Sequence, residues 1–277
     1  VDQKTEKVDI SVAGEKLAIS QKVYEKKVYK AELSSGYMRD RVHQGHFTQV
    51  KNIRASVSHQ QKNGKYKRTK IEDIEEKANL SGSSFFDNDS YFEIEYTNVK
   101  PGSYSELEYE AEVIDPHFLQ RFYFSDFVPV KAASYTVTAD DEIELGWQLF
   151  GRQKEGVKFS KSSADGRTVY TWTLENSKAY IGEPNSQGYL HHVTHLVIFI
   201  KKYSNKGTTT PVLGSVKELL DWYHSLIDDI EPLNDDGLVA LAKEITEGAT
   251  TDLQKATRPF HLVHDHSPNV ATEDGWR

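Results

Sequence analysis

The densest group of residues that could bind a metal lies near the end of the sequence, at His261, His264 and His266. On a helix, His261 and His264 share a face, and two histidines with the neighbouring Asp265 could hold zinc and leave one coordination position open. The spacing does not match the His-Glu-x-x-His pattern of zinc hydrolases, and Pro259 opposes a continuous helix. These histidines are weak metal candidates, and a solvent-facing segment is the preferred interpretation.

A second group of histidines, His191, His192 and His195, lies in a segment with strand character. On a strand only His191 and His195 point to the same side, and no acidic residue lies within the segment to complete a metal site. The Walker and Gly-x-Gly-x-x-Gly patterns are also missing, which argues against nucleotide binding. We expect neither a metal nor another cofactor.

The sequence contains no cysteine, which excludes thiol catalysis and disulfides within it. It also lacks the Gly-x-Ser-x-Gly elbow of serine hydrolases. Its 42 acidic and 34 basic residues give a net charge of -8, which argues against a nucleic acid as partner. We therefore expect that this chain is not itself an enzyme.

Aromatic residues are abundant, with 15 Tyr, 12 Phe and 4 Trp. Trp147, Trp172 and Tyr180 could line a groove for sugar rings or a peptide. Core packing explains most aromatic residues more simply. Tyr170 and Trp172 share one face of a predicted strand, and whether that face meets a core or a ligand stays open.

The stretch from Phe85 to Val130 is predicted to form the centre of a sheet. Segments 91–96 and 107–113 alternate in side-chain character, and Pro101-Gly102 between them suits a tight turn. The residues from Pro116 to Val130 are too apolar for an exposed loop. We expect them to lie across a core.

Further strands are predicted on both sides of this stretch. Asn63-Gly64 predicts a hairpin with a type I′ turn between segments 50–57 and 66–74, and Asp165-Gly166 marks another hairpin. The remaining predicted strands cover two segments within 8–29, which could equally contain a short helix, and the segments 132–137, 143–149, 157–160, 167–174 and 190–203. The longest apolar run, 196–200, is far shorter than the roughly 20 residues that a membrane-spanning helix needs.

Helices are predicted after residue 212. Ser215 and Glu218 form a capping box at the start of the first helix, and the second covers 235–247 with Gly248 as its stop. A third helix begins at Thr251, and Pro259 is predicted to break or kink it after two turns. The sequence thus predicts two parts, a β-rich domain over 1–212 and a helical segment over 213–277.

The order of several short motifs between residues 50 and 223 resembles a known family. It is the uncharacterised β-rich domain that precedes a transglutaminase-like core in exported proteins of Gram-negative bacteria. The matching motifs are Asn52-Ile53-Arg54-Ala55-Ser56, Lys65-Tyr66-Lys67, Phe85-Phe86-Asp87-Asn88-Asp89, Tyr96-Thr97-Asn98-Val99-Lys100-Pro101-Gly102-Ser103, Leu107-Glu108-Tyr109, Asp115-Pro116-His117-Phe118-Leu119, Phe122-Tyr123-Phe124, Phe127-Val128-Pro129-Val130, Tyr170-Thr171-Trp172, Val212-Leu213-Gly214 and Trp222-Tyr223.

The resemblance implies a location in the periplasm or at the cell surface. It also implies that the helical segment leads into a catalytic core whose cysteine lies in a Tyr-Gly-Asp-Cys-like motif, which this sequence does not contain. Segment 253–275 would correspond to the first helix and turn of that core.

The expected fold is mainly β, a two-layer sandwich or two packed β lobes, followed by a small helical segment. The expected function is that of a non-catalytic domain of a transglutaminase-like or cysteine-peptidase-like envelope protein, which acts as a scaffold or binds a protein partner. Two alternatives remain: a self-sufficient module that binds glycans or peptides, and a zinc-dependent hydrolase built on His261, His264 and His266.

Overall fold

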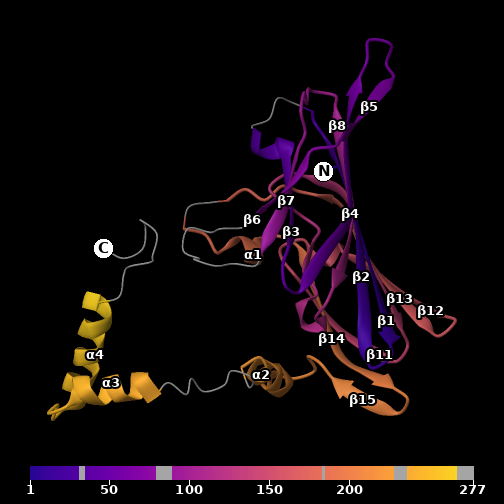
Figure 1. Ribbon diagram of the computed structural model, residues 1–277. Coiled ribbons are helices and arrows are strands. Elements are labelled where there is room, and N and C mark those ends of the chain that lie inside the picture. Colours follow the sequence, from indigo (N-terminus) through magenta and orange to yellow (C-terminus); the bar gives the residue numbers. More distant parts are fainter. Residues whose placement is uncertain (31–34, 79–88, 183–184, 228–235, 267–277) are drawn as a thin grey trace. The chain divides into compact units, whose positions relative to one another are not determined.

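The computed structural model describes residues 1–30, 35–78, 89–182, 185–227 and 236–266. The chain divides into two compact units, Val1–Asn79 with Asn88–Leu219 and Leu80–Asp87 with Leu220–Arg277. Three β-sheets build the first unit, and the described part of the second is helical (Figure 1). The prediction of a mainly β protein with a helical C-terminal segment is confirmed.

The largest sheet has eight strands in the order β12-β13-β10-β1-β2-β8-β4-β5. All neighbours in this sheet are antiparallel except β1 and β10, which run parallel with Gln3 aligned to Ala132. The strands are β1 (Gln3–Ala13), β2 (Lys16–Val28), β4 (Thr48–Gln60), β5 (Tyr66–Ile71), β8 (Tyr104–Val113), β10 (Val130–Asp140), β12 (Lys158–Ala164) and β13 (Arg167–Ser177).

Two smaller sheets and four short helical turns complete this unit. The four-stranded sheet contains β9 (Phe122–Tyr123), β11 (Ile143–Phe150), β14 (His195–Asn205) and β15 (Thr208–Pro211). The three-stranded sheet contains β3 (Arg39–Gln44), β7 (Ser90–Glu95) and β6 (Ile74–Ala78), with β7 in the centre. The helical turns are η1 (Ser35–Met38), η2 (Pro116–Phe118), η3 (Lys154–Gly156) and α1 (Tyr189–His192).

The eight-stranded sheet contributes to two hydrophobic cores. The larger core joins it to the four-stranded sheet and contains Ile10, Tyr135 and Trp172, all without exposed surface, together with Leu196 and Ile200 of β14. These side chains alternate with outward-facing ones, as the period of two along a strand requires.

The smaller core joins the same sheet to the three-stranded sheet. It contains Val57 of β4, Leu107 of β8, Val42 of β3 and Ile94 of β7. Strand β8 serves both cores, because Val113 belongs to the larger one. Each smaller sheet therefore forms a second layer on the large sheet, and the two lobes have this sheet in common.

The stretch that was predicted as the centre of one sheet belongs to two. The segment 91–96 lies in β7, which pairs with β3 and β6, whereas 107–113 lies in β8, which pairs with β2 and β4. The predicted turn is present, with Gly102 at φ 89° and the amide of Ser103 donating to the carbonyl of Lys100. The Gly102 amide of this turn donates to the Tyr29 carbonyl, and the Tyr29 amide donates to the Ser103 carbonyl. Strand β8 therefore does not pair with β7, and the prediction that 91–96 and 107–113 lie in one sheet is wrong.

The following segment lies across the larger core, as predicted. Phe122 and Phe124 have 1% and 0% of their surface exposed, and their rings meet edge to face with centroids 4.8 Å apart. Phe127 differs from these two phenylalanines, with 54% exposed.

The two predicted hairpin turns have different outcomes. Asp165 and Gly166 both have positive φ and join β12 to β13 as the two central residues, which confirms that hairpin. At Asn63-Gly64 only Gly64 has positive φ, and the Gly64 amide donates to the carbonyl of Gln61. The loop is therefore longer than a type I′ turn, and the predicted turn type is wrong. The predicted strand 66–74 also ends early, because Ile71 closes β5 and β6 starts at Ile74.

Three longer helices follow the sheets: α2 (Val216–Ser225), α3 (Asp236–Thr246) and α4 (Asp252–His266). Ser215 caps α2, since its hydroxyl accepts from the Glu218 amide at 3.2 Å. Gly248, at φ 73°, follows α3, and Arg258 of α4 donates to the carbonyl of Glu247 at 2.6 Å. None of the helices in the described ranges combines the length and apolar character that crossing a bilayer requires.

Pro259 was predicted to break or kink the third helix; α4 continues through Pro259 to His266, so it is not broken there. Proline lacks one backbone N–H donor, and the residues of the turns on both sides keep their N–H groups. The first turn is fixed by Thr251, whose hydroxyl accepts from the Gln254 amide at 3.2 Å, and by the Gln254 side chain, which accepts from the Thr250 amide at 2.9 Å.

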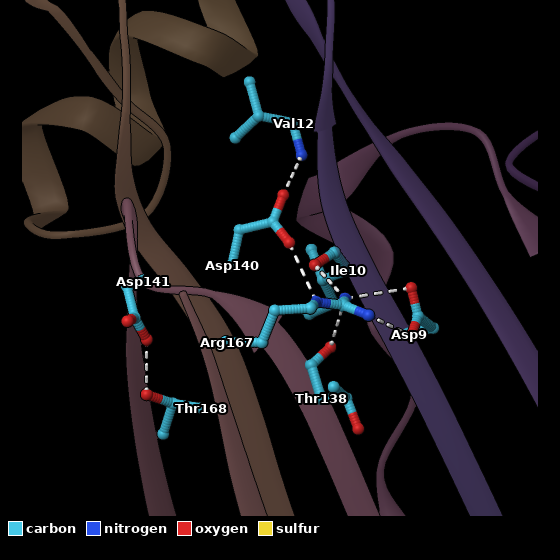
Figure 2. Close-up of polar contacts among 8 residues, drawn as sticks. All are labelled: Asp9, Ile10, Val12, Thr138, Asp140, Asp141, Arg167 and Thr168. Atoms are coloured by element: carbon cyan, nitrogen blue, oxygen red, sulfur yellow. Dashed lines mark hydrogen bonds and ion pairs between the residues drawn. The ribbon is translucent and has the colours of Figure 1, made fainter. Parts of the chain in front are cut away.

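Arg167 joins three neighbouring strands of the large sheet (Figure 2). From the start of β13 its Nε donates to Asp140 of β10 at 2.9 Å, and its two terminal nitrogens donate to both carboxylate oxygens of Asp9 of β1 at 3.0 and 3.1 Å. It also donates to the backbone carbonyls of Ile10 and Thr138. One guanidinium thus satisfies acceptors at the end of the parallel strand pair, in the bidentate geometry that suits arginine.

The second oxygen of the Asp140 carboxylate adds a contact beyond the end of the parallel pair of β1 and β10. It accepts from the Val12 amide at 2.8 Å, beyond the last aligned residues of β1 and β10. The adjacent Asp141 accepts from the hydroxyl of Thr168 at 2.6 Å, which holds the start of β13 to the end of β10 (Figure 2). Side chains therefore replace backbone pairing where the parallel strands end.

The inner face of the large sheet changes from apolar to polar along β1 and β2. Val8 and Ile10 of β1 are buried, and the next residue on that face is Glu6. Glu6 is half-buried, its closest hydrogen-bond donor is Gln21 at 3.5 Å, and loss of hydration raises its pKa from 4.5 to about 7.

Replacing Arg167 by Met should lower the free energy of unfolding by about 1–3 kcal/mol, because charged hydrogen bonds are lost and two carboxylates keep no common counter-charge. Denaturant unfolding followed by circular dichroism measures this change. The control is Arg54→Met at an exposed position, expected within about 0.5 kcal/mol of the wild type. Equal effects of the two substitutions would contradict the role assigned to Arg167.

Replacing Glu6 by Gln should stabilise the protein at pH 8 by on the order of 2 kcal/mol and much less at pH 5. The folded pKa lies above the unfolded one, so the contribution of Glu6 to stability falls as pH rises between about 4.5 and 7. Thermal unfolding at several pH values tests this. Glu72→Gln, at an exposed position, is the control. A pH-independent gain for Glu6→Gln would refute the explanation.

Candidate functional site

A network of charged and hydroxyl groups lies where β2 ends. Glu25 and Lys27 follow on the face that begins with the buried Ile19. The Lys27 ammonium contacts the carboxylate of Glu25 at 3.1 Å and also that of Asp40 on β3. Tyr96 donates its hydroxyl to the second Asp40 oxygen at 2.8 Å. The network links the eight-stranded and three-stranded sheets through side chains.

The two carboxylates determine the charge state of Lys27. Burial alone would lower its pKa, but Glu25 and Asp40 offset this effect and the pKa lies above its ordinary value. Burial and the nearby Asp40 raise the pKa of Tyr96 in turn. Lys27 stays protonated at neutral pH, so it suits ligand binding rather than nucleophilic attack.

A cavity of about 980 Å³ opens beside this network. Its lining includes Lys27, Tyr29, Asp40 and the segments 127–129 and 176–179. The volume lies in the range of small-molecule sites. The cavity therefore combines apolar walls with a charged triad, a combination suited to holding a ligand that is partly apolar and carries a polar group.

Tyr180, one of the predicted binding residues, belongs to an aromatic cluster next to this cavity. Its ring centroid lies 5.6 Å from that of Phe127, 5.5 Å from that of Tyr189 and 5.2 Å from that of His192. Phe127 stacks on Tyr189 at 4.8 Å and is itself a lining residue of the cavity. Burial and the nearby Asp126 raise the pKa of Tyr189 to about 12, so its hydroxyl stays protonated.

Trp147 and Trp172, the other predicted binding residues, meet in a different place. Trp172 has no exposed surface and is part of the larger core, which answers the question that its strand pattern left open. Trp147 is 38% exposed, and its ring centroid lies 5.5 Å from that of Trp172 and 5.0 Å from that of Phe159. Of this pair only Trp147 presents its ring to solvent.

The histidines are dispersed. His191 and His192 lie in the helical turn α1 and not in a strand, so the strand geometry assumed for them is wrong. His195 begins β14 and is buried, with its Nδ1 at 2.9 Å from the carbonyl of Val193. On α4, His264 stacks on Phe260 at 6.0 Å. Within the described residues no three His, Asp or Glu side chains gather closely enough to hold a metal ion.

Some predicted positions lie outside the described residues. These are the side chain of His266 and residues 85–88 of the family motif 85–89. The residues that sequence reasoning missed are Glu25, Lys27, Asp40 and Tyr96. The signal for the first two was available, because they continue the buried face of β2 at intervals of two. The contribution of Asp40 and Tyr96 depends on a contact between distant segments.

Residues 24–181 match the family DUF3857, described as a domain of unknown function with a solved structure. A solved structure from Parabacteroides distasonis ATCC 8503, described as a "putative protease", is similar at a TM-score of 0.67 and 17% sequence identity over 95% of this chain. At this identity the similarity shows the fold alone. The comparison with curated proteins finds no match.

The chain spans 49% of the length of the Parabacteroides protein, about half of it. The family match, in contrast, covers more than half of this chain and includes the end of β2 from residue 24, all of β8 and all of β13. These are the strands that carry the shared sheet and the charged network. This chain belongs to the DUF3857 family of domains of unknown function.

Proposed function

We propose that this chain is a non-catalytic module of a longer exported protein, in which it positions or restricts a transglutaminase-like or cysteine-peptidase-like domain. The observation that supports this proposal most directly is the similarity of nearly the whole chain to half of a protein described as a protease. The chain's motif order adds support, since it resembles domains that precede such cores. The proposed location is the periplasm or the cell surface.

The helices supply a surface on which the additional domain could pack. On α2 the apolar side chains of Leu219, Leu220 and Tyr223 are 44%, 50% and 57% exposed. On α3, Leu238 and Val239 are 57% and 52% exposed. Amphipathic helices of globular proteins bury such faces, so we assign them to contact with the rest of the full-length protein.

The native protein should have an intact mass well above the 31.6 kDa of this chain. Mass spectrometry of the protein purified from its natural source measures this directly. A native mass of 31.6 kDa would refute the proposal that this chain serves a second domain.

Replacing Leu220 by Asp should destabilise the full-length protein and leave residues 1–277 alone unaffected. The Leu220 side chain is 50% exposed, and the proposal has it covered by the additional domain. Thermal unfolding of both proteins tests the difference, with an expected loss of about 2 kcal/mol in the longer one. Ile181→Asp, at a position 81% exposed outside these helices, is the control and should change neither protein. An unchanged full-length protein would count against packing on α2.

A second candidate function is the binding of a peptide or glycan by this chain itself. The exposed rings of Trp147 and Phe159 favour it, because aromatic residues that form an exposed pair are typical of ligand surfaces. The two functions are compatible, since a module beside a hydrolytic domain could also hold its substrate.

A further inference from the structure

Strand β11 has a free edge beside a groove. Among the described strands it pairs only with β14, so its other side presents backbone groups without a neighbouring strand. The groove beside it has a volume of about 610 Å³ and is lined by Ile143 and Leu145 of β11, by Phe159 of β12 and by Tyr170 of β13. The groove thus lies between the edge of the smaller sheet and the outer strands of the larger one.

Other sheet edges in the described part of the chain carry features that oppose the addition of a strand. Charges, short strands and proline are the usual means. The charged edges are β12 with Lys158 and Lys161, β5 with Lys67, Arg68 and Lys70, β3 with Arg39, Asp40 and Arg41, and β6 with Glu75, Glu76 and Lys77. Strand β15 has four residues and ends in Pro211, and β9 has two.

Strand β11 differs from these edges in length and composition. It has eight residues, IELGWQLF, with Glu144 as its single charged one. The Glu144 carboxylate is neutralised by Lys201 at 3.1 Å and Lys202 at 3.3 Å, both on the paired strand β14. Strand β11 therefore has no proline and no charged side chain without a counter-charge, and the irregularity in its pairing with β14 is confined to the register shift between Glu144 and Leu145.

Two exposed aromatic rings, Trp147 and Phe159, line the groove. Trp147 and Phe159 are 38% and 42% exposed, their centroids lie 5.0 Å apart, and both rest on the buried ring of Trp172 at 5.5 and 5.1 Å. The buried Trp172 fixes their position, so the exposed rings form a rigid wall. Such a wall can hold one apolar side chain of a ligand.

The charges around the groove favour a basic ligand. Asp141 and Glu142, both exposed, precede β11 and line the groove. The ammonium of Lys161 lies over the ring of Tyr170, 5.1 Å from its centroid, and Lys202 is paired with Glu144. The lining therefore has three acidic residues, Asp141, Glu142 and Glu144, against two basic ones, Lys161 and Lys202, and this excess attracts a positive side chain, in agreement with the net charge of -8 for the chain.

We propose that this groove binds an extended peptide, which adds a strand to β11 and places an apolar side chain against Trp147 and Phe159 and a basic one near Asp141 and Glu142. A free strand edge recognises a peptide backbone through main-chain hydrogen bonds, and pockets for alternate side chains give the selectivity. This inference deepens the second candidate function and does not depend on the proposed additional domain.

The test uses residues 1–277 and an acetylated, amidated probe peptide, Lys-Val-Lys-Phe-Lys-Val, with a fluorescent label. Binding is measured by fluorescence anisotropy, and the site by amide hydrogen exchange. We expect slower exchange in 143–150 and a Kd at least about tenfold higher for Trp147→Ala, the loss typical of a central aromatic residue. Phe150→Ala is the matched control, because Phe150 is on the same strand with the same 38% exposure but three positions away, on the other face. It should bind the probe like the wild type.

Two further peptides separate backbone from side-chain recognition. The same peptide with every backbone nitrogen methylated keeps its side chains but cannot pair with β11, and we expect no binding. A peptide with Glu in place of Lys should bind at least about tenfold more weakly. Equal binding of the methylated peptide, or no change of exchange in 143–150, would overturn the proposal.

Two other outcomes would also overturn it in favour of a different occupant. Binding of cellohexaose in a Trp147-dependent way, without binding of the peptide, would identify a glycan site. Concentration-dependent dimers in analytical ultracentrifugation that Trp147→Ala abolishes would identify a second copy of the chain. Neither outcome bears on the native mass, so failure here is distinct from failure of the proposed scaffold function.

Discussion

The hydrogen bonds of Arg167 hold together the part of the molecule on which the rest is built. β1 is parallel to β10 and antiparallel to β2, so it connects the strands that follow residue 130 to those that precede it. Arg167, Asp9 and Asp140 satisfy backbone and charged groups where this parallel pair ends. Both cores lie on the resulting sheet. No strand of the four-stranded sheet is hydrogen-bonded to a strand of the three-stranded sheet. Their common support is the large sheet.

Local patterns were sufficient to predict the class of fold and many elements. The hairpin at Asp165-Gly166, the caps at Ser215 and Thr251 and the stop at Gly248 depend on residues close in sequence, and the structure has them. The division of 85–130 between two sheets could not be read in this way. Tyr29 binds the turn at Gly102 across more than seventy residues of sequence, and alternation alone carries no information on which strand a segment joins.

The candidate sites show the same limit. Trp172 and Trp147 have the same residue type, but Trp172 is buried on the inner strand β13, whereas Trp147 is on the edge strand β11. Exposure, which decides the role of each, follows from strand order and not from residue type. The triad of Glu25, Lys27 and Asp40 likewise required two sheets to meet. Half-buried charges of this kind cost desolvation energy, so their presence between two apolar cores favours a role in ligand binding or in fixing the orientation of the two sheets.

The parallel pairing of β1 with β10 has a consequence for the order of folding. Gln3 aligns with Ala132, so the centre of the large sheet cannot form until more than 130 residues have been synthesised. Until then the hairpin of β1 and β2 has one unpaired edge, with Val8 and Ile10 uncovered. Closing a loop of this length is slow compared with hairpin formation, and unpaired edges are prone to aggregation. The chain therefore depends on late contacts to protect its earliest strand, and a protein of this kind is expected to fold slowly and to benefit from a chaperone.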